Sequence, residues 1–154
     1  MIERLVLKNF KSHGDSEIEF NPGLNVFLGE VGAGKTSILE AISFALFGRY
    51  VGSVTHSELI RRGSEKAGIS LIFSSSSGRY KVDRTIHSEK TQRAKLLIYD
   101  GERWKLAVEG ALAVSKSIEN LLDVDSSNFL GAIYASQGET KECWKPNLER
   151  EGNA

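Results

Sequence analysis

The chain has 154 residues, 40% of them hydrophobic and 26% charged, a balance that excludes an intrinsically disordered protein. Lysine plus arginine and aspartate plus glutamate number 20 each, so no net charge attracts the whole chain to nucleic acid or to an acidic membrane. The single cysteine, Cys143, excludes an internal disulfide and a CxxC metal site, and the apolar stretches are too short to span a bilayer. We therefore expect an intracellular, cytoplasmic domain without membrane contact.

The first third of the chain alternates apolar and polar residues in the manner of β-strands. Strands are predicted around residues 5–7 and 18–20, and a third, short and mostly apolar, around residues 26–28. The segments HGD (residues 13–15) and NPG (residues 21–23) are predicted to be the turns between them.

A helix is predicted from residue 35 to residue 47. Its apolar side chains recur at helical spacing, and only Thr36, Glu40 and Ser43 form a polar stripe. Such a helix is largely buried, and Gly48 is placed to end it.

Two hairpins and a second helix are predicted in the remainder. The first hairpin spans residues 69–86 and turns at the serines of residues 74–77, and the second turns at Asp100-Gly101 between two apolar runs. Residues 111–122 have helical spacing. Residues 125–139 are predicted to be a short helix or a helix-strand junction.

The segment GEVGAGKT, residues 29–36, matches the phosphate-binding pattern G-x-x-x-x-G-K-[ST] between a predicted strand and a predicted helix. Glycines allow consecutive backbone N–H groups to surround a phosphate, and the positive end of the following helix adds to the same site. Lys35 would reach the β and γ phosphates, and the Thr36 hydroxyl would bind Mg²⁺. The alternative is a glycine-rich turn that only caps a buried helix.

The loop alone does not decide between kinases, GTPases and ATPases. The GTPase signals D-x-x-G and N-K-x-D are absent from the sequence. A self-contained kinase or NTPase needs an aspartate at the end of an apolar strand, and Asp100 in LLIYD offers one. Because Gly101 and a second apolar run follow, Asp100 is better interpreted as a hairpin residue.

Four segments together resemble one family. They are LVLKNFKSH (residues 5–13), GEVGAGKTSILEAISFALFG (residues 29–48), ELIRRG (residues 58–63) and NFLGAIYASQGE (residues 128–139). This combination is similar to the N-terminal half of the SMC-like ABC ATPases of double-strand-break repair, the Rad-fifty family of archaea and eukaryotes and SbcC of bacteria. The likeness is strongest to an archaeal Rad-fifty.

The resemblance implies an α/β fold, a P-loop NTPase of the ABC/SMC head type. The expected unit is the N-terminal lobe, with a mixed sheet and an antiparallel β subdomain around a buried P-loop helix. The ATP-binding lobe would span residues 1–139, with its P-loop at residues 29–37 and its Q-loop at residues 136–138, and residues 140–154 would form an irregular tail.

The resemblance also implies a site, residue by residue. The residues that it places around ATP are Lys11, Val31, Gly32, Ala33, Gly34, Lys35, Thr36, Ser37, Ile60, Arg61 and Arg62. Lys35 and Gln137 would be catalytic, and Thr36 and Gln137 would hold Mg²⁺, a role that suits the amide oxygen of a glutamine. Val31 stands where the family usually has asparagine, so one polar contact near the γ phosphate is missing.

Two parts of a complete head are absent from the sequence. No LSGGQ-like signature is present, and no apolar strand ends in Asp-Glu, which would supply the carboxylate that activates water. In the family these parts lie in a C-terminal lobe. The family also continues into a long coiled coil at this point of the sequence, whereas residues 140–154 of this chain contain no heptad repeat. The chain is therefore expected to be half of a head.

The resemblance implies an ATPase that is completed by the C-terminal lobe and by a second head in a homodimer. ATP-driven dimerisation would control an Mre-eleven-type nuclease at double-stranded DNA ends, in the cytoplasm or at the nucleoid. Alone, the chain would bind ATP with little turnover. A stand-alone kinase or NTPase that uses Asp100 and a non-catalytic fragment are the alternatives.

One hairpin is rich in basic residues, namely Lys81, Arg84, Lys90, Arg93 and Lys95. A contact with the DNA backbone is one interpretation. A solvated strand face is the favoured one, because Asp83 and Glu89 are interspersed among these residues. His13 is interpreted as a strand-end histidine rather than a metal ligand.

Overall fold

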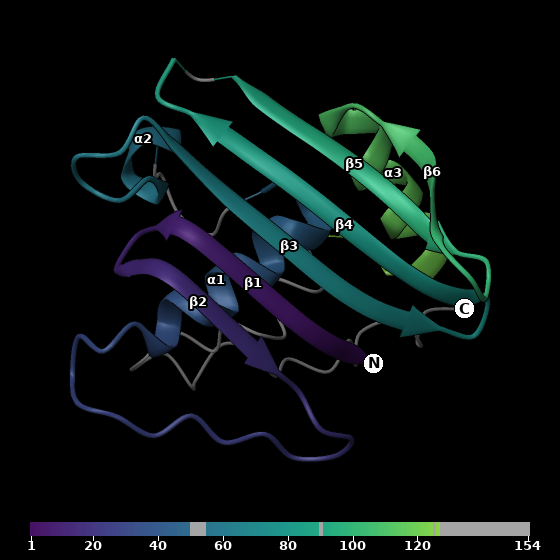
Figure 1. The fold of residues 1–154 in the computed structure, drawn as a ribbon, viewed down its shortest axis with the longest axis horizontal. Helices are drawn as coiled ribbons and strands as arrows, with labels where there is room; N and C mark the ends of the chain where they lie inside the picture. The colour runs from purple at the N-terminus through teal and green to yellow at the C-terminus, as the bar shows by residue number, and fades with distance from the viewer. Residues whose placement is uncertain (50–54, 90, 125, 127–154) are drawn as a thin grey trace, which may run out of the picture.

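The described residues form one six-stranded sheet with helices on one of its faces (Figure 1). The computed structural model describes residues 1–49, 55–89, 91–124 and 126. The strands are β1 (Ile2–Phe10), β2 (His13–Glu19), β3 (Lys66–Ser75), β4 (Gly78–His87), β5 (Gln92–Tyr99) and β6 (Trp104–Glu109). The helices are α1 (Lys35–Phe47), α2 (His56–Leu59) and α3 (Ala111–Leu122). The spatial order of the strands is β2-β1-β3-β4-β5-β6, and each neighbouring pair is antiparallel.

Helix α1 is buried between the sheet and α3. Every residue from Ala41 to Phe47 is buried, which is the pattern of a helix surrounded by apolar neighbours on all sides. The helix begins after Gly34 and ends at Gly48, whose φ of 63° is left-handed and whose N–H donates to the Phe44 carbonyl at 2.8 Å. The predicted helix over residues 35–47 and its glycine end are confirmed.

Arg84 of β4 points into the core and holds the C-terminal end of α1. Its side chain is 1% exposed, and its Nε donates to the Ala45 carbonyl at 2.6 Å and its Nη2 to the Leu46 carbonyl at 3.1 Å. Nη2 also donates to Ser115 Oγ of α3 at 2.9 Å, and Ser115 Oγ donates to the Phe47 carbonyl at 2.7 Å. Burial lowers the pKa of Arg84 to about 10, which leaves it charged at neutral pH. The guanidinium therefore joins β4, α1 and α3 through carbonyls that the helix itself leaves unpaired.

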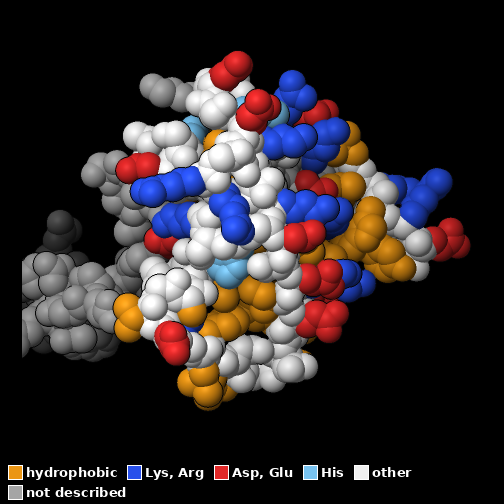
Figure 2. Space-filling model, turned by 60° about the vertical axis from the view of Figure 1, so that its left-hand side comes forward, with side chains coloured by type: hydrophobic (Ala, Val, Ile, Leu, Met, Phe, Trp, Pro, Cys, Tyr) orange, Lys and Arg blue, Asp and Glu red, His pale blue; other side chains and the backbone are white. Residues whose placement is uncertain are grey.

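The basic hairpin residues do not form one exposed basic cluster. For Arg84 both interpretations, the favoured solvated strand face and the DNA contact, are wrong, because its side chain is 1% exposed and donates to helix carbonyls inside the core. Lys81 pairs with Asp83 at 3.2 Å and Lys95 with Glu109 at 3.5 Å. On the face of the molecule that Figure 2 displays, lysine and arginine side chains are interspersed with carboxylates. Lys90 lies outside the described residues.

The strand predicted around residues 26–28 is not formed. Residues 20–30 contain no strand, and Leu24, Val26 and Leu28 are 89%, 66% and 90% exposed. A strand is stabilised by hydrogen bonds to a neighbouring strand, and the described sheet offers none to this segment. The strand prediction for this segment is therefore wrong, because alternation alone does not supply a neighbouring strand.

The first turn was also predicted two residues too late. Lys11 and Ser12 separate β1 from β2, and His13, Gly14 and Asp15 are already strand residues. Glycine and aspartate are typical of turns, which favoured HGD in the sequence. The reversal instead uses left-handed backbone at Asn9 and Lys11, with φ of 51° and 48°.

The two later hairpins are confirmed. The β3–β4 turn falls within the run of serines, and Asp100 lies in the β5–β6 turn. Asp100 Oδ1 accepts hydrogen bonds from the N–H groups of Glu102 and Arg103 at 3.0 and 2.9 Å, and Oδ2 pairs with Lys105 Nζ at 2.6 Å. The hydrogen bond from Lys105 and those from the two N–H groups lower the pKa of Asp100 to about 2. Asp100 is thus a turn-stabilising carboxylate.

The α/β class is confirmed. No helix of the described residues is long and apolar enough to cross a membrane.

Replacing Arg84 with methionine should destabilise the chain by about 2–4 kcal/mol, because buried carbonyls at the end of α1 then lack donors. The free energy of unfolding from urea denaturation measures this. Arg93→Met, a change on the exposed side of β5, is the control and should alter stability by less than about 0.5 kcal/mol. Equal losses in the two variants would contradict the role of Arg84.

Candidate nucleotide-binding site

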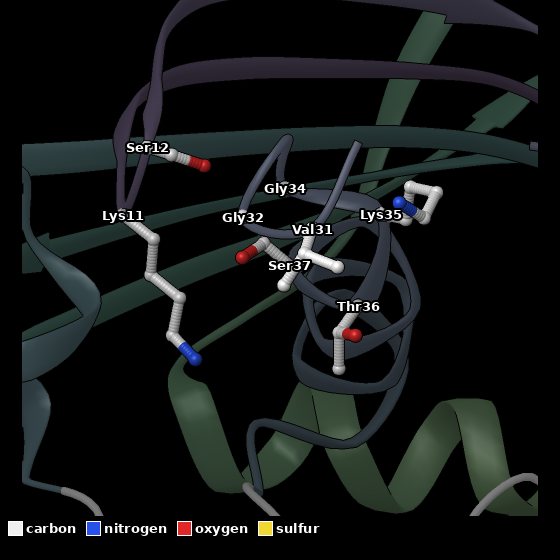
Figure 3. A pocket seen from close by; sticks show the side chains of 8 residues that line it. All are labelled: Lys11, Ser12, Val31, Gly32, Gly34, Lys35, Thr36 and Ser37. Atoms are coloured by element: carbon white, nitrogen blue, oxygen red, sulfur yellow. The ribbon is translucent and has the colours of Figure 1, made fainter. Parts of the chain in front are cut away.

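A hollow of about 490 Å³ lies where the β1–β2 turn meets the N-terminal end of α1. It is lined by Lys11, Ser12, Val31, Gly32, Gly34, Lys35, Thr36 and Ser37 (Figure 3). Two segments far apart in the sequence therefore supply one site. Its size falls within the range of small-ligand pockets, about 300–1,000 Å³.

The loop that forms the hollow depends on two glycines in left-handed conformation. Gly32 and Gly34 have φ of 86° and 87°. A Cβ at Gly34 would lie 2.6 Å from Ser12 Oγ and 2.7 Å from His13 Nε2, whereas a Cβ at Gly32 would meet nothing within 4 Å. Gly34 is thus required both by its backbone and by the close approach of the β1–β2 turn.

The first turn of α1 lines the hollow. The N–H groups at a helix start have no intrahelical acceptor, and the helix dipole adds partial positive charge there. Gly34 supplies the first helical acceptor, since its carbonyl receives the Ile38 N–H at 3.3 Å. Thr36 and Ser37, in this first turn, place hydroxyl groups at the same hollow. This is the chemistry of an anion site.

Lys35 donates to acceptors of its own loop. Its Nζ lies 2.6 Å from the Gly29 carbonyl and 2.7 Å from the Glu30 carbonyl. These carbonyls keep the ammonium beside the hollow. An anion entering the hollow would compete with them for the same charge.

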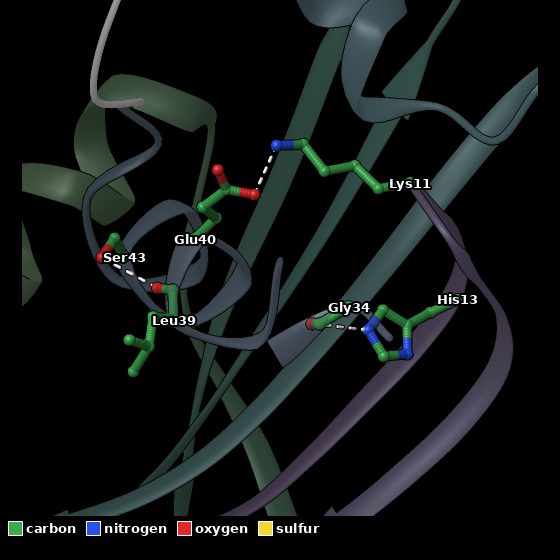
Figure 4. Close-up of polar contacts among 6 residues, drawn as sticks. All are labelled: Lys11, His13, Gly34, Leu39, Glu40 and Ser43. Carbon is green, nitrogen blue, oxygen red and sulfur yellow. Dashed lines mark hydrogen bonds and ion pairs between the residues drawn. The ribbon is translucent and has the colours of Figure 1, made fainter. Parts of the chain in front are cut away.

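Lys11 reaches into the site from the β1–β2 turn and forms an ion pair with Glu40 of α1 (Figure 4). The last residue of α2 and the segment that follows it hold this turn. The Lys11 N–H donates to the Leu59 carbonyl at 2.8 Å, and the Arg61 N–H donates to the Asn9 carbonyl at 2.8 Å. The strained turn is therefore fixed by backbone hydrogen bonds on both sides of Phe10.

The residues of the ELIRRG segment support the site without lining the hollow. Ile60 is 7% exposed in the core and bridges to Phe10 of β1. Arg61 Nη1 donates to the Ser12 carbonyl at 3.3 Å. Arg62 is exposed. The segment thus positions the turn that carries Lys11 and Ser12.

His13 and Ser12 are site residues that sequence reasoning missed. His13 is the first residue of β2, as the strand-end interpretation expected. Its Nε2 also lies 3.2 Å from the Gly34 carbonyl, and its Nδ1 lies 3.0 Å from Ser16 Oγ (Figure 4). The imidazole therefore connects the sheet to the loop. The signal was the KSH sequence directly after the first strand, but nothing in its spacing indicated a contact with a loop about 20 residues later.

The other expected site residues differ in exposure. Val31 is fully exposed at the rim of the hollow. The Cβ of Ala33 lies 3.3 Å from the point that a Cβ added to Gly29 would occupy. Gln137, the expected metal and water ligand, lies outside the described residues. Among the residues that the structure describes, no group of three or more His, Cys, Asp or Glu is placed to hold a metal ion.

A family model described as an AAA domain matches residues 4–151. The DNA double-strand break repair Rad50 ATPase of Methanopyrus kandleri is 41% identical over 143 residues, 90% of this chain and 16% of the relative. That of Archaeoglobus fulgidus is 34% identical over 151 residues, 98% of this chain and 16% of the relative. The chain therefore spans about one sixth of the length of these curated relatives.

Two solved structures share the fold. The recombination mediator protein RecF with ATP superposes with a TM-score of 0.59 at 20% identity, over 69% of this chain and 28% of that chain. The SMC head domain from Thermotoga maritima gives 0.55 at 21% identity, over 77% of this chain and 41% of that chain. At these identities the likeness concerns the fold, and the expected ABC/SMC head type is confirmed.

Replacing Gly34 with alanine should destabilise the chain by about 1–3 kcal/mol more than replacing Gly32 with alanine. Both changes place a Cβ on a left-handed backbone, but only the one at Gly34 meets Ser12 and His13. Urea denaturation of the two variants isolates this contact. Equal destabilisation of the two variants would show that Ser12 and His13 do not pack closely against Gly34.

Proposed function

Because the chain belongs to the AAA domain family and has the fold of SMC and RecF heads, we propose that it is the ATP-binding half of an ABC-type ATPase head. The observation that carries the proposal is the hollow at the start of α1, where Gly34, Lys35 and Thr36 meet the turn bearing Lys11. The Rad50 relatives, named for double-strand break repair, support a role in that process. The functional lobe would span residues 1–139, and residues 140–154 would form a tail.

The hydrogen-bond donors of the hollow fit a nucleoside triphosphate with Mg²⁺. Backbone N–H groups at the helix start and the Lys35 ammonium would hold the β and γ phosphates. The Thr36 hydroxyl would be a magnesium ligand, together with phosphate oxygens and Gln137. Mg²⁺, when bound, would neutralise charge on the phosphates during transfer to water. Lys35 and Gln137 are the residues of this chain that we assign to catalysis.

The nucleotide would also contact the surrounding residues that the family pattern supplies. Val31, Gly32, Ala33 and Ser37 would surround the phosphates through backbone and hydroxyl groups. Lys11 would approach from the β1–β2 turn, where its backbone N–H donates to the Leu59 carbonyl. Of the segment Ile60, Arg61 and Arg62, the two exposed arginines would form the side of the site next to Ser12, and Ile60 would support them from the core.

A C-terminal lobe of the same ATPase is the proposed partner of the segment around Leu24, Val26 and Leu28. These alternating side chains are exposed on a segment that is neither helix nor strand and has no neighbouring strand in the described sheet. Pairing with a strand of a second lobe would satisfy the backbone and bury the apolar row. That lobe would also supply the signature motif and the carboxylate that activates water.

Further partners follow from the family likeness alone. They are a second head in a homodimer, an Mre-eleven-type nuclease and double-stranded DNA ends. ATP-driven dimerisation of the heads would control end processing by the nuclease. The proposed compartment is the cytoplasm or the nucleoid.

The stand-alone kinase alternative is not favoured by the geometry. Asp100 is engaged by Lys105 and by two backbone N–H groups of its own turn. It is not among the residues that line the hollow. The chain is thus proposed to bind ATP without an Asp100-based reaction.

Lys35→Ala should weaken ATP binding about tenfold or more, since charge-assisted hydrogen bonds to phosphate are lost. Isothermal titration with ATP and Mg²⁺ measures the dissociation constant. Lys66→Ala removes the same charge from an exposed position at the start of β3 and should leave binding unchanged. Unchanged affinity in Lys35→Ala would place the nucleotide elsewhere.

The purified chain should release phosphate from ATP at a rate no higher than that of its Lys35→Ala variant. The water-activating carboxylate and the signature motif are absent from its sequence. A phosphate-release assay measures the rate, and Asp100→Asn should not change it. Steady turnover that Asp100→Asn abolishes would favour the kinase-like alternative.

A further inference from the structure

The ion pair between Lys11 and Glu40 connects the site to a carboxylate that does not line it. Lys11 is a lining residue of the hollow, whereas Glu40 lies on α1, one turn beyond Thr36. Both side chains are shielded, with 23% of Lys11 and 14% of Glu40 exposed. A carboxylate beside a site for a polyphosphate is unfavourable unless a cation neutralises it. The Lys11 ammonium is therefore within reach of two anions, the Glu40 carboxylate and a polyphosphate bound in the hollow.

The backbone of Lys11 is fixed, so only its side chain can move between these anions. Lys11 has a left-handed φ of 48°, which is strained for a residue with a side chain. Hydrogen bonds to Leu59 and Arg61 on either side of Phe10 maintain this conformation. Strained backbone of this kind is common at functional sites. Here the long, flexible side chain of Lys11 extends along the edge of the hollow (Figure 3).

A second carboxylate lies within electrostatic range. The pKa of Glu58 is lowered mainly by hydrogen bonds from Thr55 and, to a smaller extent, by the charge of Lys11. Glu58 is exposed and already caps α2, since its Oε2 accepts the Thr55 N–H at 2.6 Å. Glu40 is shielded from solvent and contacts the Lys11 ammonium directly, so it competes most strongly with an incoming anion.

We propose that Glu40 is a built-in competitor that holds the Lys11 ammonium until a polyphosphate takes it, and that Glu40 thereby lowers the affinity of the site for polyphosphates. The inference rests on the proposed function, in that the hollow takes the phosphates of a nucleotide. Transfer of Lys11 from Glu40 to the phosphates replaces one charge-assisted contact with another. The net binding energy is smaller than if Lys11 had no carboxylate partner.

Glu40→Gln tests the inference, because it removes the charge and keeps the size of the side chain. It should tighten binding of ATP and of inorganic tripolyphosphate about two- to fivefold, the range expected for a partly exposed ion pair. Glu19→Gln, the same change at the far end of β2, should have no effect. Titration calorimetry at fixed ionic strength measures each constant, and circular dichroism verifies folding.

The Lys11→Met background shows whether Glu40 acts through Lys11. The gain from Glu40→Gln should disappear in the double variant. An equal gain there would mean direct repulsion between Glu40 and the phosphates, and weaker or unchanged binding in Glu40→Gln would mean no competition. Each of these results would overturn the inference.

The two probes separate this inference from the proposed function. Binding of tripolyphosphate but not ATP would contradict the proposed nucleotide site while the effect of Glu40 is still measured. Binding of both probes without an effect of Glu40→Gln would overturn the inference alone. No binding of either probe by the unaltered chain would overturn both.

Discussion

The burial of α1 is the constraint on which the rest of the structure depends. The buried run from Ala41 to Phe47 requires donors inside the protein for the last carbonyls of α1, and a ligand site at the other end requires that the N–H groups of the first turn stay accessible. Arg84 meets the first requirement through the Ala45 and Leu46 carbonyls. Gly34 meets the second, because it starts the helix where His13 and Ser12 hold the loop against the sheet. The hollow thus lies at the exposed N-terminal end of α1, a helix whose C-terminal half is buried in the core.

The cations of the hollow have internal acceptors. Lys35 donates to loop carbonyls, and Lys11 pairs with Glu40. A triphosphate therefore gains only the difference between its own contacts and these. Such a site binds through many modest contacts, and a partner that closes over the nucleotide would strengthen them by excluding water. Modest contacts of this kind are expected of the proposed ATP site, which a second lobe and a second head would complete.

Local sequence signals predicted those elements whose determinants are also local. The buried helix, its Gly48 end and the Asp100-Gly101 hairpin follow from spacing and turn chemistry within a few residues. The strand around Val26 was wrong, because a strand also needs a neighbour that the pattern does not reveal. Arg84 was placed on a solvated strand face or a DNA contact, since a basic residue on an alternating strand gives no sign of the helix end that it faces in the core. His13 was missed as a contact of the loop for the same reason: its partner, Gly34, is close only in the folded chain.

Titration of ATP and Mg²⁺ into the ¹⁵N-labelled chain, followed by the backbone amide resonances, tests the central claim most directly. We expect the largest shifts at Gly34, Lys35 and Thr36, whose N–H groups would donate to the phosphates. Smaller shifts should follow at Lys11 and Ser12 in the facing turn, and β6 should be unaffected. Shifts confined to other parts of the chain, or none at millimolar ATP, would contradict a nucleotide site at the start of α1.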